Sequence, residues 1–346
     1  MKAGIISFSR RGFELGETLK EGLKRQGWQV EVYGKSRYMG EGSQAGQVKE
    51  SVGQWTGENF SRMDALIYVG ACGIAVRSIA PYIRHKTTDP AVVVVDERGR
   101  FSISLLSGHI GGGNDLAQTA AEIIGAQPVV TTATDLNGLF AVDVFAKKNG
   151  CHIADMKLAK EVSAQLLAGK QVGFYSDFPW KGELPRGLTV EGRPDLGIAV
   201  TIHCKERPFS NTLYLIPKAL TVGIGCRKGT PSQAVEAAVE SAADCLQIPM
   251  AAIERAASID LKKDEAGIVE SCRKWNVPFE TFSAEELQAL AGTYTPSPFV
   301  KSIAGVDNVC ERSAVLASGN GKLILRKTVR DGVTVALAMR AWTPSF

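Results

Sequence analysis

The residues best suited to chemistry in this chain are a histidine and the glycines around it. Residues 107–114 read Ser-Gly-His-Ile-Gly-Gly-Gly-Asn. Histidine is the side chain that most readily moves protons near neutral pH, so His109 is a candidate general base or acid. The glycines would let the backbone approach a ligand closely, because they carry no Cβ.

The elements that must position this histidine are a strand and a helix. We expect the strand over 101–105 and a helix near Asn114, whose side chain is of a type that caps helix N-termini. A helix start carries free N–H groups and the positive end of the helix dipole, which attract an anion or a developing oxyanion. The spacing matches neither the dinucleotide fingerprint nor the P-loop, so a ligand site and a purely structural turn both stay open.

Other loops could also bind an anionic ligand. Residues 70–73 follow a predicted strand and lead to Arg77, although a solvated surface arginine is the more common finding. Thr132 and Asp135 lie just past a strand expected at 127–131, where they could bind ligand or cap a helix. The basic, glycine-bounded loop 225–230 precedes a further predicted helix and is another possible anion cradle.

Composition restricts the class of protein. Hydrophobic residues make up 45% and charged residues 22% of the 346, which is typical of a globular protein with an ample core. The net charge of +4 favours an acidic ligand and is too small to indicate nucleic-acid binding. The seven cysteines are scattered and never spaced Cys-x-x-Cys, which predicts reduced thiols and no thiolate metal site. Without a recognisable signal peptide or membrane span, we expect a cytoplasmic protein that does not bind membranes.

Strands and helices alternate along the chain, which predicts an α/β fold. We expect an N-terminal domain over 1–137, with an open, mainly parallel sheet that carries the glycine-rich ligand loops. A small middle α/β domain should span 138–218, and a C-terminal α/β (α+β) domain should span 219–346. The strands expected in the first domain are 3–8, 29–33, 65–69, 91–95, 101–105 and 127–131.

Several long motifs resemble those of one family, the cobalt-precorrin-5A hydrolases of anaerobic (early-cobalt) cobalamin biosynthesis. The middle third matches more by position than by motif. One departure is Gly113, where the family pattern has alanine, and this change removes no functional group. The segments that carry the resemblance are 73–77, 89–97, 104–109, 131–135, 223–229, 259–265 and 305–312.

The resemblance implies a hydrolase. Its substrate would be a ring-contracted cobalt tetrapyrrole with a lactone between a ring acetate and the extruded meso carbon. Water opens the lactone, and the two-carbon fragment leaves as acetaldehyde to give cobalt-precorrin-5B. The reaction needs a base, donors for the oxyanion and an electron sink for carbon–carbon cleavage. The cobalt macrocycle can be that sink, so we expect no separate cofactor and no metal site of the protein's own.

Within that scheme, His109 is predicted to be the general base, and the amides near residues 112–114 are predicted to hold the oxyanion. Asp135 would orient His109 or cap a helix. Glu311 and Asp260 are rival acid–base candidates. Cations would bind the substrate's peripheral carboxylates. The full set of predicted substrate contacts is Gly73, Arg77, Lys86, Ser107, Gly108, Gly111, Gly112, Gly113, Asn114, Thr132, Cys226, Arg227, Lys228 and Asp260.

The sequence leaves two other functional classes open. A tetrapyrrole carrier or chaperone of the same pathway would use the same anion-binding loops but would need no base. A nucleotide-binding regulator would rest on the glycine-rich loops alone. The last third also resembles a small stand-alone protein of the aerobic cobalamin route, which suggests that it helps to bind the macrocycle. A homodimer and transient contacts with neighbouring pathway enzymes are further expectations.

Overall fold

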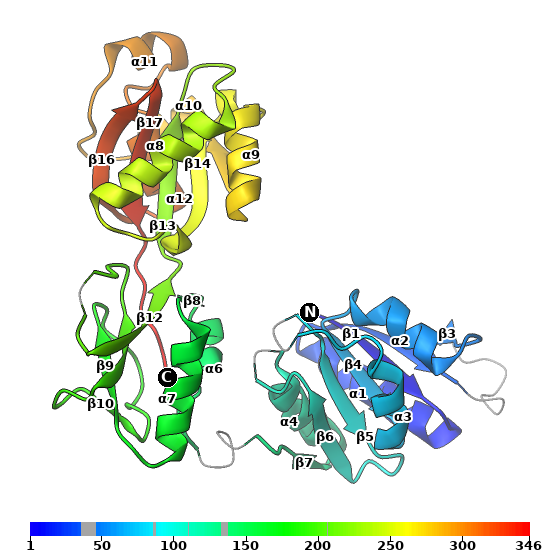
Figure 1. The fold of residues 1–346 in the computed structure, drawn as a ribbon. Coiled ribbons are helices and arrows are strands. Elements are labelled where there is room, and N and C mark those ends of the chain that lie inside the picture. Colours follow the sequence, from blue (N-terminus) through cyan, green and yellow to red (C-terminus); the bar gives the residue numbers. More distant parts are fainter. Residues whose placement is uncertain (36–45, 86–87, 110, 133–137, 206) are drawn as a thin grey trace. The chain divides into compact units, whose positions relative to one another are not determined.

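The computed structural model describes residues 1–346 except 36–45, 86–87, 110, 133–137 and 206 (Figure 1). The chain forms two compact units, Met1–Val144 and Phe145–Phe346, and each is described by itself. Both consist of mixed sheets covered by helices, so the predicted α/β class is confirmed. Among the described residues, no helix is both long enough and apolar enough to cross a membrane.

The first unit is built on a seven-stranded sheet with the order β3-β2-β1-β4-β5-β6-β7. The five strands from β3 to β5 are parallel, whereas β6 runs antiparallel to β5, and β7 is parallel to β6. The strands are β1 (Lys2–Ser7), β2 (Gln29–Gly34), β3 (Gly46–Gln47), β4 (Ala65–Val69), β5 (Ala91–Val95), β6 (Phe101–Leu106) and β7 (Gln127–Val129).

Helices cover both faces of this sheet because successive strand residues point to opposite sides. Ile5 packs with α1 (Arg10–Arg25) and α4 (Gly113–Ile124). Its neighbour Ile6 packs with α2 (Val52–Phe60) and α3 (Cys72–Ile79) on the other face. All five residues of β5 are buried, and apolar side chains cover both of its faces, as a central strand requires.

The reversal at β6 determines which loops meet. A tight turn joins β5 to β6, and the Asp96 carboxylate accepts hydrogen bonds there from the backbone N–H groups of Arg98, Arg100 and Phe101. In the antiparallel register Leu106 lies opposite Val92, near the beginning of β5. The loop after β6 therefore lies at the edge where β4 and β5 begin. Because β7 is parallel to β6, the residues after both strands lie at that same edge.

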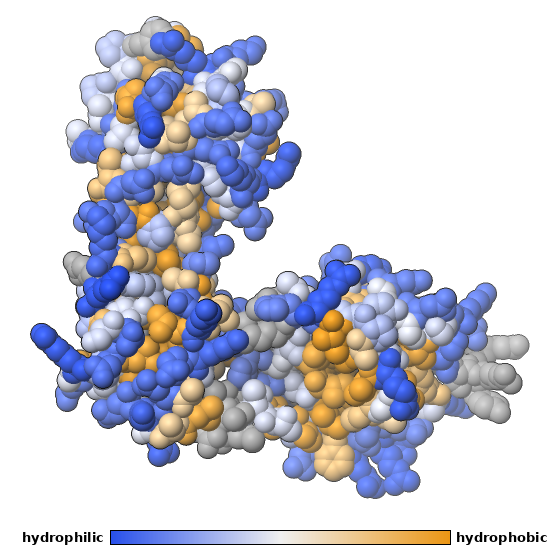
Figure 2. Space-filling view, viewed as in Figure 1, coloured by the Kyte–Doolittle hydropathy of each residue, from blue (hydrophilic) through white to orange (hydrophobic). Residues whose placement is uncertain are grey.

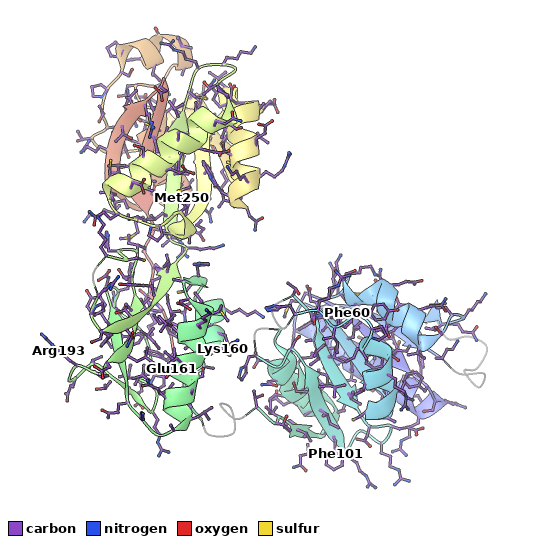
Figure 3. The ribbon with its side chains drawn as sticks, in the orientation of Figure 1. Phe60, Phe101, Lys160, Glu161, Arg193 and Met250 are labelled. Carbon is purple, nitrogen blue, oxygen red and sulfur yellow. The ribbon has the colours of Figure 1, made fainter. Side chains whose placement is uncertain are left out.

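The second unit contains two five-stranded sheets. The middle sheet has the order β10-β9-β11-β12-β8 and packs against α7 (Met156–Leu167), whose charged residues Lys160 and Glu161 are exposed (Figure 3). The short helix α6 (Val142–Lys148) contains the boundary between the two units. The strands of the middle sheet are β8 (Cys151–Ile153), β9 (Val172–Ser176), β10 (Leu188–Thr189), β11 (Leu196–Val200) and β12 (Asn211–Pro217).

The last sheet has the order β15-β14-β13-β17-β16. Its central strand β13 (Leu220–Gly225) is parallel to β14 (Ile253–Ile259) and antiparallel to β17 (Val333–Met339). One face packs on α8 (Ser232–Cys245) and α9 (Ala266–Trp275). The remaining elements are β15 (Phe279–Phe282), β16 (Lys322–Arg330), α10 (Ala284–Ala289), α11 (Pro298–Ala304), α12 (Cys310–Ala317) and the 3-10 helices η1 (Met250–Ala252) and η2 (Asp260–Lys262).

The residues after β17 return from the last sheet to the middle one. Both ends of the Asn149 side-chain amide form hydrogen bonds with the backbone of Ser345. The backbone carbonyl of Asn149 accepts a hydrogen bond from the Trp342 indole N–H at 3.2 Å. The Phe346 ring packs 5.1 Å from that of Phe145. These contacts give a physical reason for the middle and last sheets to form one compact unit. The division into three domains at 137 and 218 stays a prediction.

Candidate active site

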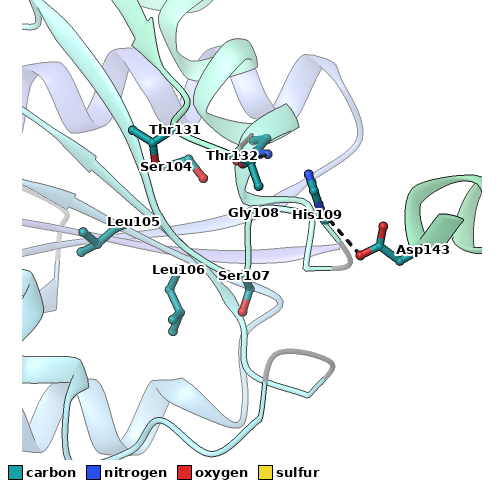
Figure 4. A pocket seen from close by; sticks show the side chains of 10 residues that line it. Ser104, Leu105, Leu106, Ser107, Gly108, His109, Thr131, Thr132 and Asp143 are labelled. Atoms are coloured by element: carbon teal, nitrogen blue, oxygen red, sulfur yellow. Dashed lines mark hydrogen bonds and ion pairs between the residues drawn. The ribbon is translucent and has the colours of Figure 1, made fainter. Parts of the chain in front are cut away.

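A cavity of about 510 Å³ opens in the first unit beside His109 (Figure 4). It lies at the sheet edge where β6 and β7 end, so the parallel pairing of these strands brings the histidine loop next to Thr131 and Thr132. The residues that line it are Ser104, Leu105, Leu106, Ser107, Gly108, His109, Asn114, Thr131, Thr132 and Asp143.

The His109 ring points towards Asp143, in the first turn of α6 (Figure 4). Nδ1 lies 3.6 Å from Oδ2, and the two side chains are 18% and 20% exposed. Burial alone would raise the pKa of Asp143, but the contact with His109 and the backbone N–H of Val144 outweigh it and lower that pKa. Asp143 is therefore an anion at neutral pH that favours a proton on Nδ1, which leaves Nε2 as the basic nitrogen.

The turn that carries His109 is tightly closed. Ser107 has a left-handed backbone with φ 55°, which is unusual for a residue other than glycine. A Cβ on Gly111 would lie 2.3 Å from that of Ser107, and a Cβ on Gly113 would lie 2.7 Å from the Leu106 carbonyl oxygen. The glycines therefore allow the turn to fold against itself. Gly111, Gly112 and Gly113 do not line the cavity.

The backbone amides predicted to hold the oxyanion already have acceptors. Gly112 N donates to the His109 carbonyl at 2.9 Å, Gly113 N to that of Ser107 at 3.0 Å, and Asn114 N to that of Gly108 at 2.9 Å. The closed turn uses these hydrogens internally, so this arrangement does not offer them to a ligand. The polar side chains of the cavity are other donors in the described part of the chain. Among them, Asn114 Nδ2 lies 2.9 Å from Thr132 Oγ1.

The structure does not place Gly73 and Arg77 with His109. Both are exposed residues of α3, which follows the carboxyl end of β4, and neither lines the cavity. The carboxyl ends of β4 and β6 lie at opposite edges of the sheet because β6 is reversed. Two further predicted residues, Lys86 and Asp135, lie outside the described part of the chain.

The predicted site residues of the last third belong to the second unit. Glu311 is fully buried in α12, where its carboxylate accepts hydrogen bonds from Thr295 N, Thr295 Oγ1 and Lys327 N at 2.7–2.8 Å. Asp260 is exposed in η2. The residues Cys226, Arg227 and Lys228 line a second cavity of about 1010 Å³. Burial raises the pKa of the Cys226 thiol, an effect that the nearby Lys262 only partly opposes.

Asp143 was not among the site residues predicted from the sequence. Asp143 lies in the first turn of α6, and an acidic residue at that position of a helix is common without any catalytic role. The only signal in the sequence was its position shortly after the motif 131–135. Its distance from His109 required the three-dimensional structure.

The fold and this cavity define a multi-sheet α/β protein with a histidine–carboxylate pair on the wall of a cavity. Three family models match the chain in order: Cobalamin synthesis G N-terminal at residues 54–135, Cobalamin biosynthesis central region at 140–217, and Cobalamin synthesis G C-terminus at 220–338. This chain belongs to the cobalamin synthesis G family.

Two relatives in sequence agree with that assignment. A cobalt-precorrin-5A hydrolase of Salmonella typhimurium is 35% identical over 293 residues, which cover 81% of this chain and 83% of the relative. A protein of the same name from Priestia megaterium is 29% identical over 360 residues, which cover 97% of this chain and 94% of the relative. The crystal structure of a cobalamin biosynthesis protein G homologue from Sulfolobus solfataricus is 25% identical, with a TM-score of 0.44 and coverage of 98% of this chain and 97% of that one.

Proposed function

We propose that this protein is a cobalt-precorrin-5A hydrolase, which opens the lactone of its substrate and releases acetaldehyde to give cobalt-precorrin-5B. The family assignment and the names of its relatives support this activity. The structural observation that carries it is the His109–Asp143 pair on the wall of an open polar cavity. A carrier would need no such pair.

The first step is attack of water on the lactone carbonyl carbon. His109 Nε2 takes a proton from the water while Asp143 stabilises the imidazolium that forms. The carbon–oxygen bond of the lactone then breaks, which leaves a carboxylate on the ring acetate and a hydroxyl on the former meso carbon. The hydroxyl side chains of Ser104 and Thr131 supply polar hydrogens for the oxyanion on the cavity wall.

The second step is cleavage of a carbon–carbon bond. Loss of the hydroxyl proton allows the carbon–oxygen double bond of acetaldehyde to form, and the electron pair of the broken bond passes into the macrocycle. We propose that the cobalt tetrapyrrole is its own electron sink, so the protein contributes positioning and proton transfer and holds no resident cofactor.

The size of the cavity limits what it can enclose. Pockets of about 300–1,000 Å³ enclose drug-sized ligands. A tetrapyrrole with its acid side chains is larger than such ligands. The cavity of about 510 Å³ therefore suits the lactone-bearing edge of the macrocycle. We further propose that the protein acts in the cytoplasm, where reduced thiols and an unstable anaerobic intermediate are both maintained.

An isotope experiment tests this mechanism. The reaction would be run without oxygen in water enriched in ¹⁸O, and the tetrapyrrole product would be analysed by mass spectrometry. Water attack at the carbonyl predicts one ¹⁸O in the new ring carboxylate. Conversion without label in that carboxylate would contradict it. Binding of intact substrate without conversion would favour a carrier.

The variant Asp143→Asn tests the role of the carboxylate. We expect turnover to fall by about 10²-fold, because the imidazole loses its orienting anion and part of its basicity. Substrate binding should remain. Since folding lowers the pKa of Asp143, its contact stabilises the protein above the ordinary carboxyl pKa and is lost as pH falls through the lowered value. Acid unfolding of the variant should therefore depend less on pH in that range. Unchanged turnover of Asp143→Asn would argue against a catalytic role for the His109–Asp143 pair.

A further inference from the structure

The second cavity lies in the last lobe of the second unit, which is the part built on the β15-β14-β13-β17-β16 sheet. Its walls come from the carboxyl ends of β13 and β14, the loops that follow them, helix α11, the start of α12 and the β16–β17 hairpin. This is the position where β13 has a parallel neighbour on one side and an antiparallel neighbour on the other. Ligands of open α/β sheets commonly bind in the crevice beyond the carboxyl ends of the strands.

Large apolar side chains reach the solvent around this cavity. Leu261 of η2 is 68% exposed, and Ile303 of α11 and Val329 of β16 are each 65% exposed. Apart from Met1, they are the most exposed large hydrophobic residues in the described part of the chain. Figure 2 shows apolar residues at the surface of this lobe among charged ones. An apolar surface contributed by three separate elements indicates a binding face.

Cations accompany the apolar wall. Arg227, Lys228 and Lys327 line the cavity, and no ion pair with an acidic side chain is found for them among the described residues. The fourth cation, Lys262, is bound to Glu265 at 2.7 Å. The Glu265 carboxylate also accepts from Gly229 N at 2.7 Å, so this acid holds the basic loop in place. One further acid, Asp264, lies on the rim.

The floor of the cavity is preformed. Asn308 Oδ1 accepts from Glu311 N at 2.8 Å, and Asn308 Nδ2 donates to the Thr295 carbonyl at 2.9 Å. A Cβ on Gly223 would lie 1.8 Å from the Cys310 carbonyl oxygen, so α12 rests directly on β13. A rigid site of this kind loses little entropy when a ligand binds.

We propose that this cavity, defined here as the C-terminal groove, is a second tetrapyrrole-binding site that does not include His109. The apolar wall contacts a face of the macrocycle, and the three cations bind its carboxylates. The ligand class rests on the proposed function, since an apolar, flat polyanion complements both features. With about 1010 Å³, the groove is twice as large as the His109 cavity.

A porphyrin that cannot react tests the groove without catalysis. Uroporphyrin is flat, carries eight carboxylates and has no lactone, and its binding to the full-length protein can be followed by fluorescence. We expect Val329→Glu to weaken binding by about tenfold or more, through lost apolar contact and charge repulsion. Val190→Glu is the matched control, because Val190 is 58% exposed and outside the groove.

Charge is tested in the same way. Lys228→Glu should weaken uroporphyrin binding by about tenfold, whereas Lys170→Glu, an exposed lysine outside the groove, should not. Added salt should reduce the difference between wild type and Lys228→Glu. Equal affinity of wild type and both groove variants, with folding verified by circular dichroism, would overturn the proposal. So would a change in oligomeric state on Val329→Glu without a change in affinity, which would identify a self-association face.

The two proposals can fail separately. His109→Ala should bind uroporphyrin as tightly as wild type, because the groove lacks His109. Loss of acetaldehyde release in that variant with retained porphyrin binding supports both assignments. Acetaldehyde release by wild type together with porphyrin binding that ignores the groove variants would leave the hydrolase intact and remove the second site.

Discussion

Replacement of His109 by alanine is expected to lower lactone turnover by about 10²- to 10⁴-fold, the usual contribution of a positioned general base. His109 is the only imidazole in the described lining of the cavity, whose other polar residues are hydroxyls, an amide and the Asp143 carboxylate. The lowered pKa of Asp143 makes that carboxylate a weaker base than an imidazole. The measurement is the initial rate of acetaldehyde release at saturating substrate. Binding should change little, because the ring covers only part of the cavity wall.

A matched variant separates this effect from general damage. His203 is an exposed histidine of the second unit, so His203→Ala should retain the wild-type rate. Added imidazole should restore part of the activity of His109→Ala and should leave wild type unchanged. Wild-type turnover by His109→Ala would remove the histidine from the mechanism.

Replacement of Glu311 by alanine should chiefly destabilise the second unit. The change leaves three donors without their acceptor, namely the two groups of Thr295 and the backbone N–H of Lys327. Each unsatisfied buried donor costs about 1–3 kcal/mol, so we expect a loss of roughly 3 kcal/mol or more in the free energy of unfolding. Urea denaturation measures it, with the exposed Glu285→Ala as control.

The conservative variant Glu311→Gln distinguishes structure from catalysis. An amide oxygen can keep part of the hydrogen bonding, so the variant should be more stable than Glu311→Ala and should retain turnover. A folded Glu311→Gln that no longer releases acetaldehyde, combined with an active His109→Ala, would move the chemistry to α12.

The sequence patterns were sufficient for the fold class and for the loop that carries His109. The buried valines of β5 and the glycine-rich turn before α4 are local features, and local features can be predicted. The strands 91–95 and 101–105 on either side of Asp96 were also predicted, but not the consequence of the turn between them. By reversing β6, it places Arg77 and His109 at opposite edges of one sheet, and such a separation depends on pairing between strands.

Contacts between distant residues account for what the sequence did not reveal. Asp143 meets His109 across 34 positions of chain, and no spacing rule connects them. The amides of residues 112–114 looked like oxyanion donors because helix starts usually have free N–H groups. Here the carbonyls of Ser107, Gly108 and His109 turn back to accept them. The exposure of Leu261, Ile303 and Val329 likewise exists only in the folded lobe.

The most direct test is anaerobic incubation of the purified protein with the cobalt lactone intermediate, with acetaldehyde and tetrapyrrole product quantified in the same sample. If the protein is a lactone hydrolase that acts through His109, wild type should give equal amounts of acetaldehyde and cobalt-precorrin-5B. His109→Ala should give almost none of either. Intact lactone bound to wild type without acetaldehyde, from substrate verified by mass, would contradict the hydrolase and identify a carrier.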